Sequence, residues 1–293
     1  MVREKPAPLL FSAKFRSMNH NSRQGSEVFV TFSGGLGAQI FSCAIYFFLK
    51  KKGRAVYAQL EYFQQPGKTA TVGNKGEVSH WNYELGEFGL PPEGFSIKKI
   101  EKSVFKRNKP EVISDSAGKV TLAIEALRQQ EVRNIFPIKH SIVDECNKVS
   151  GGNDYLCIHI RRGDYVNVAS HLVDEMDFVK LANSISNFVH SVIVISDSGV
   201  SGMVREQLSG LFTHCSFVIG GSPHVAHALM RRAKYLICSN SQFSLSAALL
   251  NEVGQQVFLP TKWFGDADSS IQMPINALCR FQVLNQRWPN VDR

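Results

Sequence analysis

The sequence has no apolar run long enough to cross a membrane. Its longest such run, residues 40–49, is interrupted by Ser42, and a membrane-spanning helix needs roughly 20 apolar residues. Residues 1–27 are polar and basic, and their one apolar spot, residues 9–11, is too short for the core of a secretory signal. We therefore expect a cytoplasmic protein.

The sequence also lacks paired cysteines. There is no CxxC and no Cys/His spacing of the kind that binds zinc, and several of the six cysteines lie inside apolar runs, where a thiol behaves as a small hydrophobic side chain. We expect buried structural thiols in a reducing compartment, without a disulfide framework or a metal site. The six are Cys43, Cys146, Cys157, Cys215, Cys238 and Cys279.

An excess of acidic residues is absent too. The 33 Lys and Arg outnumber the 25 Asp and Glu, which gives a net charge of +8, and 44% of the 293 residues are hydrophobic, enough for a large core and two lobes. Five basic and two acidic residues in 1–27 (net +3) and six basic and one acidic in 96–110 (net +5) account for the whole excess. Two local patches favour contact with an anionic membrane surface over a diffuse nucleic-acid site, so no nucleic-acid partner is expected.

The first half of the chain predicts a strand, glycine turn, helix and strand. Residues 27–32 (EVFVTF) form the first strand, residues 33–37 the turn, residues 38–52 the helix and residues 54–60 the second strand, a unit typical of parallel sheets. Residues 61–110 predict irregular structure, followed by coarse helices at 122–131 and 141–149. We place a lobe boundary at Gly151-Gly152.

The second half alternates more clearly. Short β-branched runs predict five strands, and segments of helical composition lie between most of them, which indicates a doubly wound, Rossmann-like sheet. The strands are 154–160, 191–196, 216–219, 235–238 and 256–259, and the helices are 174–189, 200–211, 224–234 and 243–253. The predicted domains are a basic tail at 1–27, a first lobe at 28–151, a second lobe at 152–275 and a C-terminal segment at 276–293.

Polar residues follow three of these strands. Ligands of a parallel sheet bind at the carboxyl ends of its strands, where Arg161 and Arg162 follow the first run, Asp197 the second and residues 239–242 (SNSQ) the fourth. Paired guanidinium groups match the oxygens of a pyrophosphate, and an ion pair with Asp164 or another carboxylate is the structural alternative.

The other two polar loops also have two readings each. Residues 239–244 offer hydroxyls and helix N-terminal N–H groups as a second anion cradle, or they are a plain helix cap. Asp197 is a candidate to bind a ribose hydroxyl or a base edge, or it is a turn aspartate that bonds its own backbone. Their expected convergence at one sheet edge favours the functional readings.

Four motifs in order resemble one known family. Residues 159–165 (HIRRGDY) resemble the HxRRGDY motif of the α-1,2-fucosyltransferases, glycosyltransferase family eleven. Residues 34–41 (GGLGAQIF) resemble its GGLGNQMF, residues 195–198 (ISDS) its SDD segment and residues 239–244 (SNSQFS) its NSTFSWW segment. Residues 258–264 are similar to the strand and PxxWF tail that follow.

The resemblance implies a GT-B-like α/β fold, with two Rossmann-like lobes and parallel sheets. It implies an inverting, metal-independent transfer of L-fucose from GDP-fucose to the 2-hydroxyl of a galactoside, carried by a galactose-terminated oligosaccharide or a lipid-linked glycan. Arg161 would hold the pyrophosphate and stabilise the leaving GDP, Arg162 would support the loop, and Asp164 would be the base or would aim Arg161.

The resemblance also assigns the donor-binding residues. His159 and Asp197 would contact guanine or ribose, and Ser241 and Ser244 would receive phosphate. The full donor-binding set is His159, Arg161, Arg162, Asp197, Ser239, Asn240, Ser241, Phe243, Ser244, Gly35, Gly37 and Gln39.

The sequence departs from the family at four positions. Ala38 stands where the family has Asn, Ser198 replaces the second Asp of SDD, and Leu245-Ser246 replace a double Trp. Because the departures affect the acceptor and fine donor specificity more than the anion clamp, two alternatives stay open. One is a GT-B GDP-sugar transferase of the O-fucosyltransferase kind with another acceptor. The other is a non-enzymatic, basic, anion-binding protein.

Overall fold

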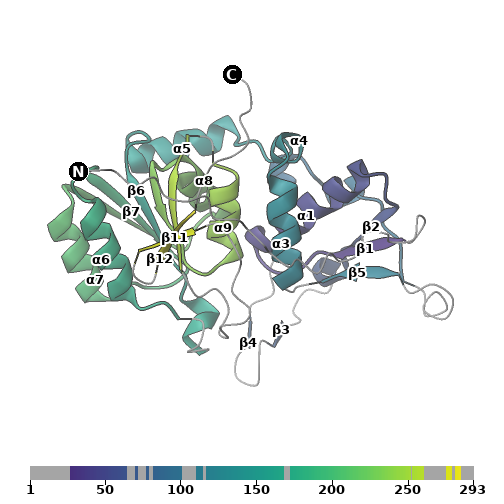
Figure 1. Ribbon diagram of the computed structural model, residues 1–293, viewed down its shortest axis with the longest axis horizontal. Helices are drawn as coiled ribbons and strands as arrows, with labels where there is room; N and C mark the ends of the chain where they lie inside the picture. The colour runs from purple at the N-terminus through teal and green to yellow at the C-terminus, as the bar shows by residue number, and fades with distance from the viewer. Residues whose placement is uncertain are drawn as a thin grey trace, which may run out of the picture.

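The computed structural model describes residues 27–64, 70–71, 77–78, 82–100, 110–114, 117–167, 172–251, 253–260, 275–278 and 281–284. In this part of the chain two α/β lobes lie side by side (Figure 1). No helix among these residues has the length and apolarity that a membrane span requires. Most of both predicted basic patches, residues 1–26 and 101–109, lies outside the described residues.

The first lobe is built on a parallel sheet of order β2-β1-β5. The strand β1 (Val28–Thr31) is central, with β2 (Val56–Gln59) and β5 (Glu111–Ile113) beside it, and α1 (Leu36–Lys51) crosses from β1 to β2. The smaller elements are η1 (Glu61–Gln64), β3 (Ala70–Thr71), β4 (Glu77–Val78), η2 (Leu85–Phe88), η3 (Pro92–Gly94), α3 (Ala117–Leu127) and α4 (Gln130–Arg133).

The second lobe holds a seven-stranded sheet of order β11-β12-β10-β9-β6-β7-β8. The five strands from β6 to β10 are parallel, and β11 and β12 close one edge as an antiparallel hairpin. The strands are β6 (Leu156–Ile160), β7 (Ser191–Ser196), β8 (His214–Ile219), β9 (Tyr235–Ile237), β10 (Gln256–Pro260), β11 (Ile275–Leu278) and β12 (Phe281–Leu284). The helices are α5 (His140–Ser150), η4 (Gly163–Asn167), α6 (Glu175–Ile185), α7 (Gly202–Leu211), α8 (Pro223–Arg232) and α9 (Gln242–Leu249).

Both faces of this second sheet are covered, as the apolar runs predict. Side chains of a strand point alternately to its two faces, so on β6 Leu156 and Ile158 join the core under α6 and α7. Cys157, between them, joins the core under α8 and α9. Two lobes, each with a parallel sheet, confirm the expected GT-B-like fold class.

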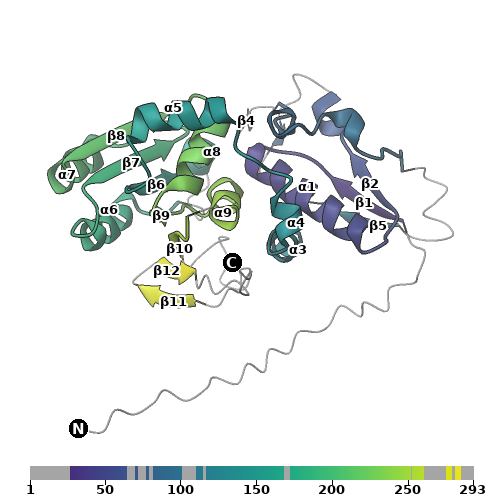
Figure 2. The same ribbon diagram turned by 90° about the horizontal axis from the view of Figure 1, so that it is seen from above.

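One hydrophobic core runs through both lobes. It includes Val28 and Ile40 of the first lobe and Leu245 and Leu249 of the second, because α9 packs against α1 and α3 (Figure 2). The approach is closest at Gly37, where a Cβ atom would lie under 3.0 Å from backbone atoms of Gln242 and Phe243. Only a glycine lets the two helix N-termini meet at this distance.

The lobe boundaries differ from the prediction at two places. Gly151 has φ +65° and caps the C-terminus of α5, a helix that packs on α8 in the second lobe, so the chain crosses between lobes at 134–139 and not at Gly151-Gly152. The segment predicted as separate, 276–293, contributes β11 and β12 to the second sheet. In both cases packing on a neighbouring element, which local sequence does not show, sets the boundary.

Several elements also differ from those predicted. The strand β5 lies just beyond the range predicted as irregular, where no element was predicted, and its pairing with β1 reveals it. The helix predicted at 243–253 ends at Leu249. The coarse helix at 122–131 is two helices, α3 and α4.

Candidate donor-binding site

The polar loops of the second lobe meet at the switch point of its sheet. The chain adds β7 and β8 on one side of β6 and then returns to add β9 and β10 on the other, and ligands of open α/β sheets bind where the order reverses. The loops after β6 and β9 flank this point. They touch through Tyr165, whose hydroxyl donates a hydrogen bond to the carbonyl of Asn240 at 3.2 Å.

Arg161 is held by the loop that follows β7. Its Nη1 lies 2.5 Å from Oδ2 of Asp197, and the guanidinium also stands over the ring of Tyr165, 5.4 Å from its centroid. The second oxygen of Asp197, Oδ1, accepts hydrogen bonds from the backbone N–H groups of Arg162 (2.9 Å) and Gly163 (3.1 Å). A Cβ on Gly163 would collide with this carboxylate, which explains the glycine.

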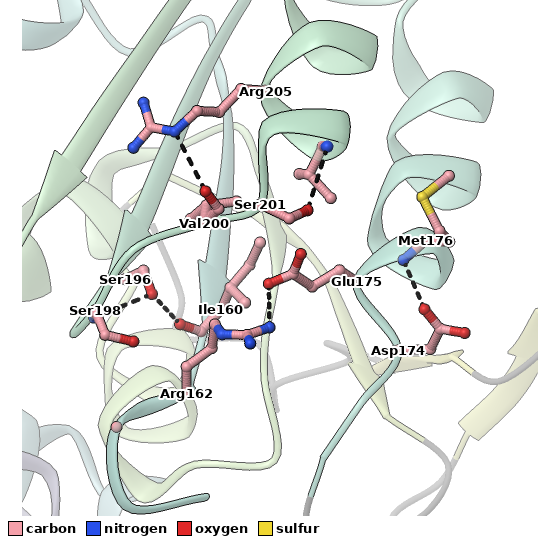
Figure 3. A network of polar contacts seen from close by, with 12 residues as sticks. Ile160, Arg162, Asp174, Glu175, Met176, Ser196, Ser198, Val200, Ser201 and Arg205 are labelled. Atoms are coloured by element: carbon pink, nitrogen blue, oxygen red, sulfur yellow. Dashed lines mark hydrogen bonds and ion pairs between the residues drawn. The ribbon is translucent and has the colours of Figure 1, made fainter. Parts of the chain in front are cut away.

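Arg162 turns to the other side of the loop and pairs with Glu175 at the start of α6 (Figure 3). Asp174 caps that helix by accepting a hydrogen bond from the N–H of Met176 at 3.0 Å. The Arg162 contact is what the predicted loop-supporting role requires. Both arginines have carboxylate partners, as the structural alternative expected, so the chain's own side chains hold this loop.

His159 lies beneath the loop, at the end of β6. Its side chain is buried and its ring meets Phe243 edge-on, with centroids 5.5 Å apart. Burial, reinforced by the positive charge of Arg161 and opposed by Asp197, lowers the pKa of His159 to about 3, so the imidazole is neutral at physiological pH. Its Nδ1 has no hydrogen-bond partner among the described residues.

The turn after β9 places its hydroxyls inward. Ser241 is the N-cap of α9 and accepts a hydrogen bond from the N–H of Phe243. Ser244 is fully buried, and its hydroxyl donates to the carbonyls of Ser239 and Ser241 at 3.1 and 3.3 Å, so this side chain stabilises the turn. Asn240 is also buried. The groups of this turn suited to an anion are the N–H groups at the start of α9.

The first lobe brings its glycine turn to the same place. Gly35 is the N-cap of α1, and because glycine has no side chain, this residue gives the N–H groups at the helix end no side-chain hydrogen bond. The amide of Gln39 is engaged within the lobe: Nε2 donates to the carbonyls of Gly34 (2.9 Å) and Asn82 (2.8 Å), and Oε1 accepts from the N–H of Glu84 (2.8 Å). Gln39 therefore shapes the turn.

The predicted base, Asp164, lies on η4, and its side chain is outside the described part of the chain. Among the described side chains, Asp197 places a carboxylate on Arg161. No group of three His, Cys, Asp or Glu side chains suited to a metal ion occurs among the described residues. Metal independence stays a prediction.

The sequence analysis missed two residues that support the site. Glu175 holds Arg162, and the one signal for it is an acid at the predicted start of a helix. His227 of α8 also packs against Phe243, with ring centroids 5.6 Å apart, and its Nε2 is 3.1 Å from Oγ of Ser246. Ser246 and its neighbour Leu245 are fully buried, so the departure from the double tryptophan is accommodated in the core.

A model of one known protein family matches part of the chain. Residues 129–271 match the model of glycosyl transferase family 11, which confirms the resemblance for that segment. It includes the Arg161 loop, Asp197 and the start of α9. No curated protein sequence matches the chain significantly.

Solved structures of fucosyltransferases are similar at low sequence identity. The fucosyltransferase NodZ from Bradyrhizobium is 16% identical over 85% of this chain and 98% of that chain, with a TM-score of 0.44. NodZ alpha-1,6-fucosyltransferase co-crystallized with GDP is 17% identical over 81% and 95%, with a TM-score of 0.42. POFUT1 in complex with GDP-fucose is 13% identical over 77% and 93%, with a TM-score of 0.41.

Proposed function

With a glycosyl transferase family 11 segment at residues 129–271 as the premise, we propose that the protein is an inverting fucosyltransferase. It transfers L-fucose from GDP-fucose to the 2-hydroxyl of a galactoside. The observation that carries the proposal is the convergence, at the sheet switch point inside the matched segment, of the Arg161 loop and the N-terminus of α9. Together they offer a guanidinium and helix N–H groups to a pyrophosphate.

Arg161 supplies the main chemical assistance in this proposal. Departure of GDP develops negative charge on the β-phosphate oxygen, and a fixed guanidinium stabilises that charge more in the transition state than in the ground state. Asp197 fixes the guanidinium through Oδ2 while Oδ1 holds the backbone of the loop. The guanidinium therefore needs little reorientation when the negative charge develops on the leaving GDP.

Inversion requires the acceptor hydroxyl to attack from the face opposite the leaving GDP. Asp164, on the loop next to Arg161, is the proposed base that takes its proton. The neutral imidazole of His159 contributes ring contact and one unpartnered nitrogen toward the nucleotide. No metal ion takes part in this scheme.

Nucleotide binding gives the direct test. GDP and GDP-fucose at millimolar concentration should raise the melting temperature, since a ligand that binds only the folded state stabilises it. Arg161→Ala should abolish the rise. Arg205→Ala is the matched control, because Arg205 on α7 stacks on Phe217 and donates to the carbonyl of Val200 (Figure 3), and it is not among the predicted donor-binding residues. Thermal indifference of the wild type to guanine nucleotides would refute the proposal.

The acceptor is tested separately, with labelled GDP-fucose. We expect label on galactose-terminated oligosaccharides, and loss of labelling when the galactose 2-hydroxyl is replaced by hydrogen. Label on a peptide or on a core glycan alone would overturn the galactoside assignment and leave the donor assignment in place. Label on none of them, with GDP binding intact, would point to a lipid-linked acceptor, which vesicles containing such a glycan would then test.

A further inference from the structure

The two lobes are joined by a pair of titratable side chains outside the donor site. Glu84 precedes η2 in the first lobe, and His224 lies in the first turn of α8 in the second. Nε2 of His224 is 3.3 Å from Oε2 of Glu84, an ion-pair distance without hydrogen-bond alignment. The histidine side chain is 6% exposed and the glutamate 25%, so solvent screens this contact less than a surface pair.

The glutamate is tied directly to the glycine turn of the first lobe. Its backbone N–H donates to Oε1 of Gln39 at 2.8 Å, and Nε2 of Gln39 donates to the carbonyl of Gly34 at 2.9 Å. Gln39 is fully buried, so these bonds are shielded from water. A continuous set of contacts thus runs from His224, across the lobe boundary, to the turn that starts α1.

Aromatic packing encloses the pair. Phe88 of η2 packs edge-on against the His224 ring, with centroids 5.4 Å apart, and against Phe136 of the segment between α4 and α5 at the same distance. Through these contacts the first-lobe segment at 82–90 packs against the second lobe. Nearby charged and titratable groups are Glu87, Lys139, His227 and Arg231.

We propose that Glu84 and His224 are an interlobe positioning pair for the transfer reaction. They fix the glycine turn of the first lobe, on the acceptor side, relative to the donor-binding turn at the start of α9. The tolerance is small, because Gly37 already lies against the backbone of Phe243 with no room for a methyl group. A displacement of about 1 Å between reacting groups can cost on the order of 100-fold in rate. This inference rests on the proposed fucosyl transfer.

For variants of this pair we expect a nearly unchanged Kd for GDP and a lower kcat. The proposed phosphate contacts, the Arg161 loop and the start of α9, lie in the second lobe, so Glu84→Gln should leave the Kd for GDP within about two-fold of wild type. The value of kcat should fall by about 10- to 100-fold, since the lobes no longer hold the reacting groups in register. His224→Phe, which keeps the ring against Phe88 and removes the nitrogens, should behave in the same way.

Glu87→Gln is the matched control. Glu87 lies three residues along the same segment and pairs with Lys139 at 2.8 Å, but both side chains are about half exposed (52% and 47%). Exposed pairs contribute little, so this variant should keep the wild-type kcat. The double variant of Glu84→Gln and His224→Phe should be no slower than either single variant, because the two side chains act through one contact.

Hydrogen exchange separates this inference from the proposed function. In the ligand-free protein, Glu84→Gln should speed amide exchange in both 82–90 and 223–232, whereas Glu87→Gln should not. If the wild type transfers no fucose, the function fails and exchange still tests the pair. If amide exchange in Glu84→Gln equals that of the wild type, the proposed positioning pair is wrong. It is also wrong if Glu84→Gln has the same kcat as Glu87→Gln, or if its affinity for GDP falls as much as its kcat. If His224→Phe does not fold, Glu84→Gln alone decides.

Discussion

At the scale of single residues, the Arg161 loop owes its shape to carboxylates that the motif alone does not pair. Asp197 contacts the Arg161 guanidinium and two backbone N–H groups, and Glu175 takes Arg162. Charge-assisted hydrogen bonds of this kind are stronger than neutral ones and fix direction as well as distance. The loop therefore holds both guanidinium groups in a defined orientation.

The buried His159 gives a prediction on stability. Its pKa is lowered to about 3 in the folded protein, so between pH 3 and 6.5 the unfolded chain binds more protons and stability rises with pH. On lowering the pH from 7 to 5, this histidine should cost about 2 kcal/mol of unfolding free energy. Urea unfolding of wild type and His159→Phe at both pH values measures the difference.

That comparison has an internal control. Above pH 7 the imidazole is neutral in both states, so the stability difference between wild type and His159→Phe should no longer depend on pH. His227, whose pKa is also lowered by burial, acts in the same direction in both proteins and cancels. Equal acid sensitivity of the two proteins would show that His159 charges freely when folded.

At the scale of elements, the important juxtaposition is that of two helix N-termini from different lobes. The start of α1 meets the start of α9 at Gly37. At the start of α9, backbone N–H groups and the positive end of the helix dipole together favour the proposed phosphate ligand. The spacing of the two N-termini is set by backbone contact, with no side chain between them.

Gly37→Ala tests this contact. The added methyl group would lie under 3.0 Å from backbone atoms of Gln242 and Phe243, which cannot rotate away, so α1 and α9 must separate. We expect a loss of stability of about 1–3 kcal/mol or more and weaker GDP binding, measured by thermal unfolding and calorimetry.

Gly202→Ala is the control for that substitution. Gly202 is the first residue of α7, and a Cβ there meets nothing within 4 Å. Alanine should leave GDP binding unchanged and stability equal or slightly higher. Equal effects of the two substitutions would mean that helix propensity, and not the contact between lobes, explains the Gly37 result.

At the scale of the whole molecule, the lobes share one hydrophobic core through α1, α3 and α9. A domain with its own core can unfold alone, whereas elements that bury their apolar faces against each other unfold together. Arg231 adds to the joint: it is buried in α8 and donates to the carbonyls of Phe136 in the crossing segment and Leu250 at the end of α9.

We therefore expect a single cooperative unfolding transition. Near- and far-ultraviolet circular dichroism should give coincident thermal curves, and the calorimetric and van't Hoff enthalpies should agree. GDP should shift the whole transition, although its proposed phosphate contacts lie in the second lobe. Two resolved transitions, of which GDP moves only one, would show that the shared core does not couple the lobes.

Local sequence was enough to predict the second lobe and the place of its site. Alternating apolar runs and helical segments define β6 to β10 and α6 to α9, and strand ends must gather at one edge of a parallel sheet, so Arg161, Asp197 and the start of α9 were expected together. Local pattern failed for β5 and for the β11–β12 hairpin, which exist through pairing with distant strands. The prediction of a lobe boundary at Gly151 was also wrong, because this glycine is the C-cap of α5.

The sequence by itself determined the fold class, the position of the Arg161 loop and the family resemblance, because these depend on periodicity and on residues that are neighbours in the chain. Only the tertiary structure decided what holds those residues. It placed Asp197 and Glu175 on the two arginines, turned Ser244 and Gln39 inward, and set Glu84 of one lobe against His224 of the other. Contacts between residues far apart in sequence follow from how whole elements pack, which no local pattern encodes.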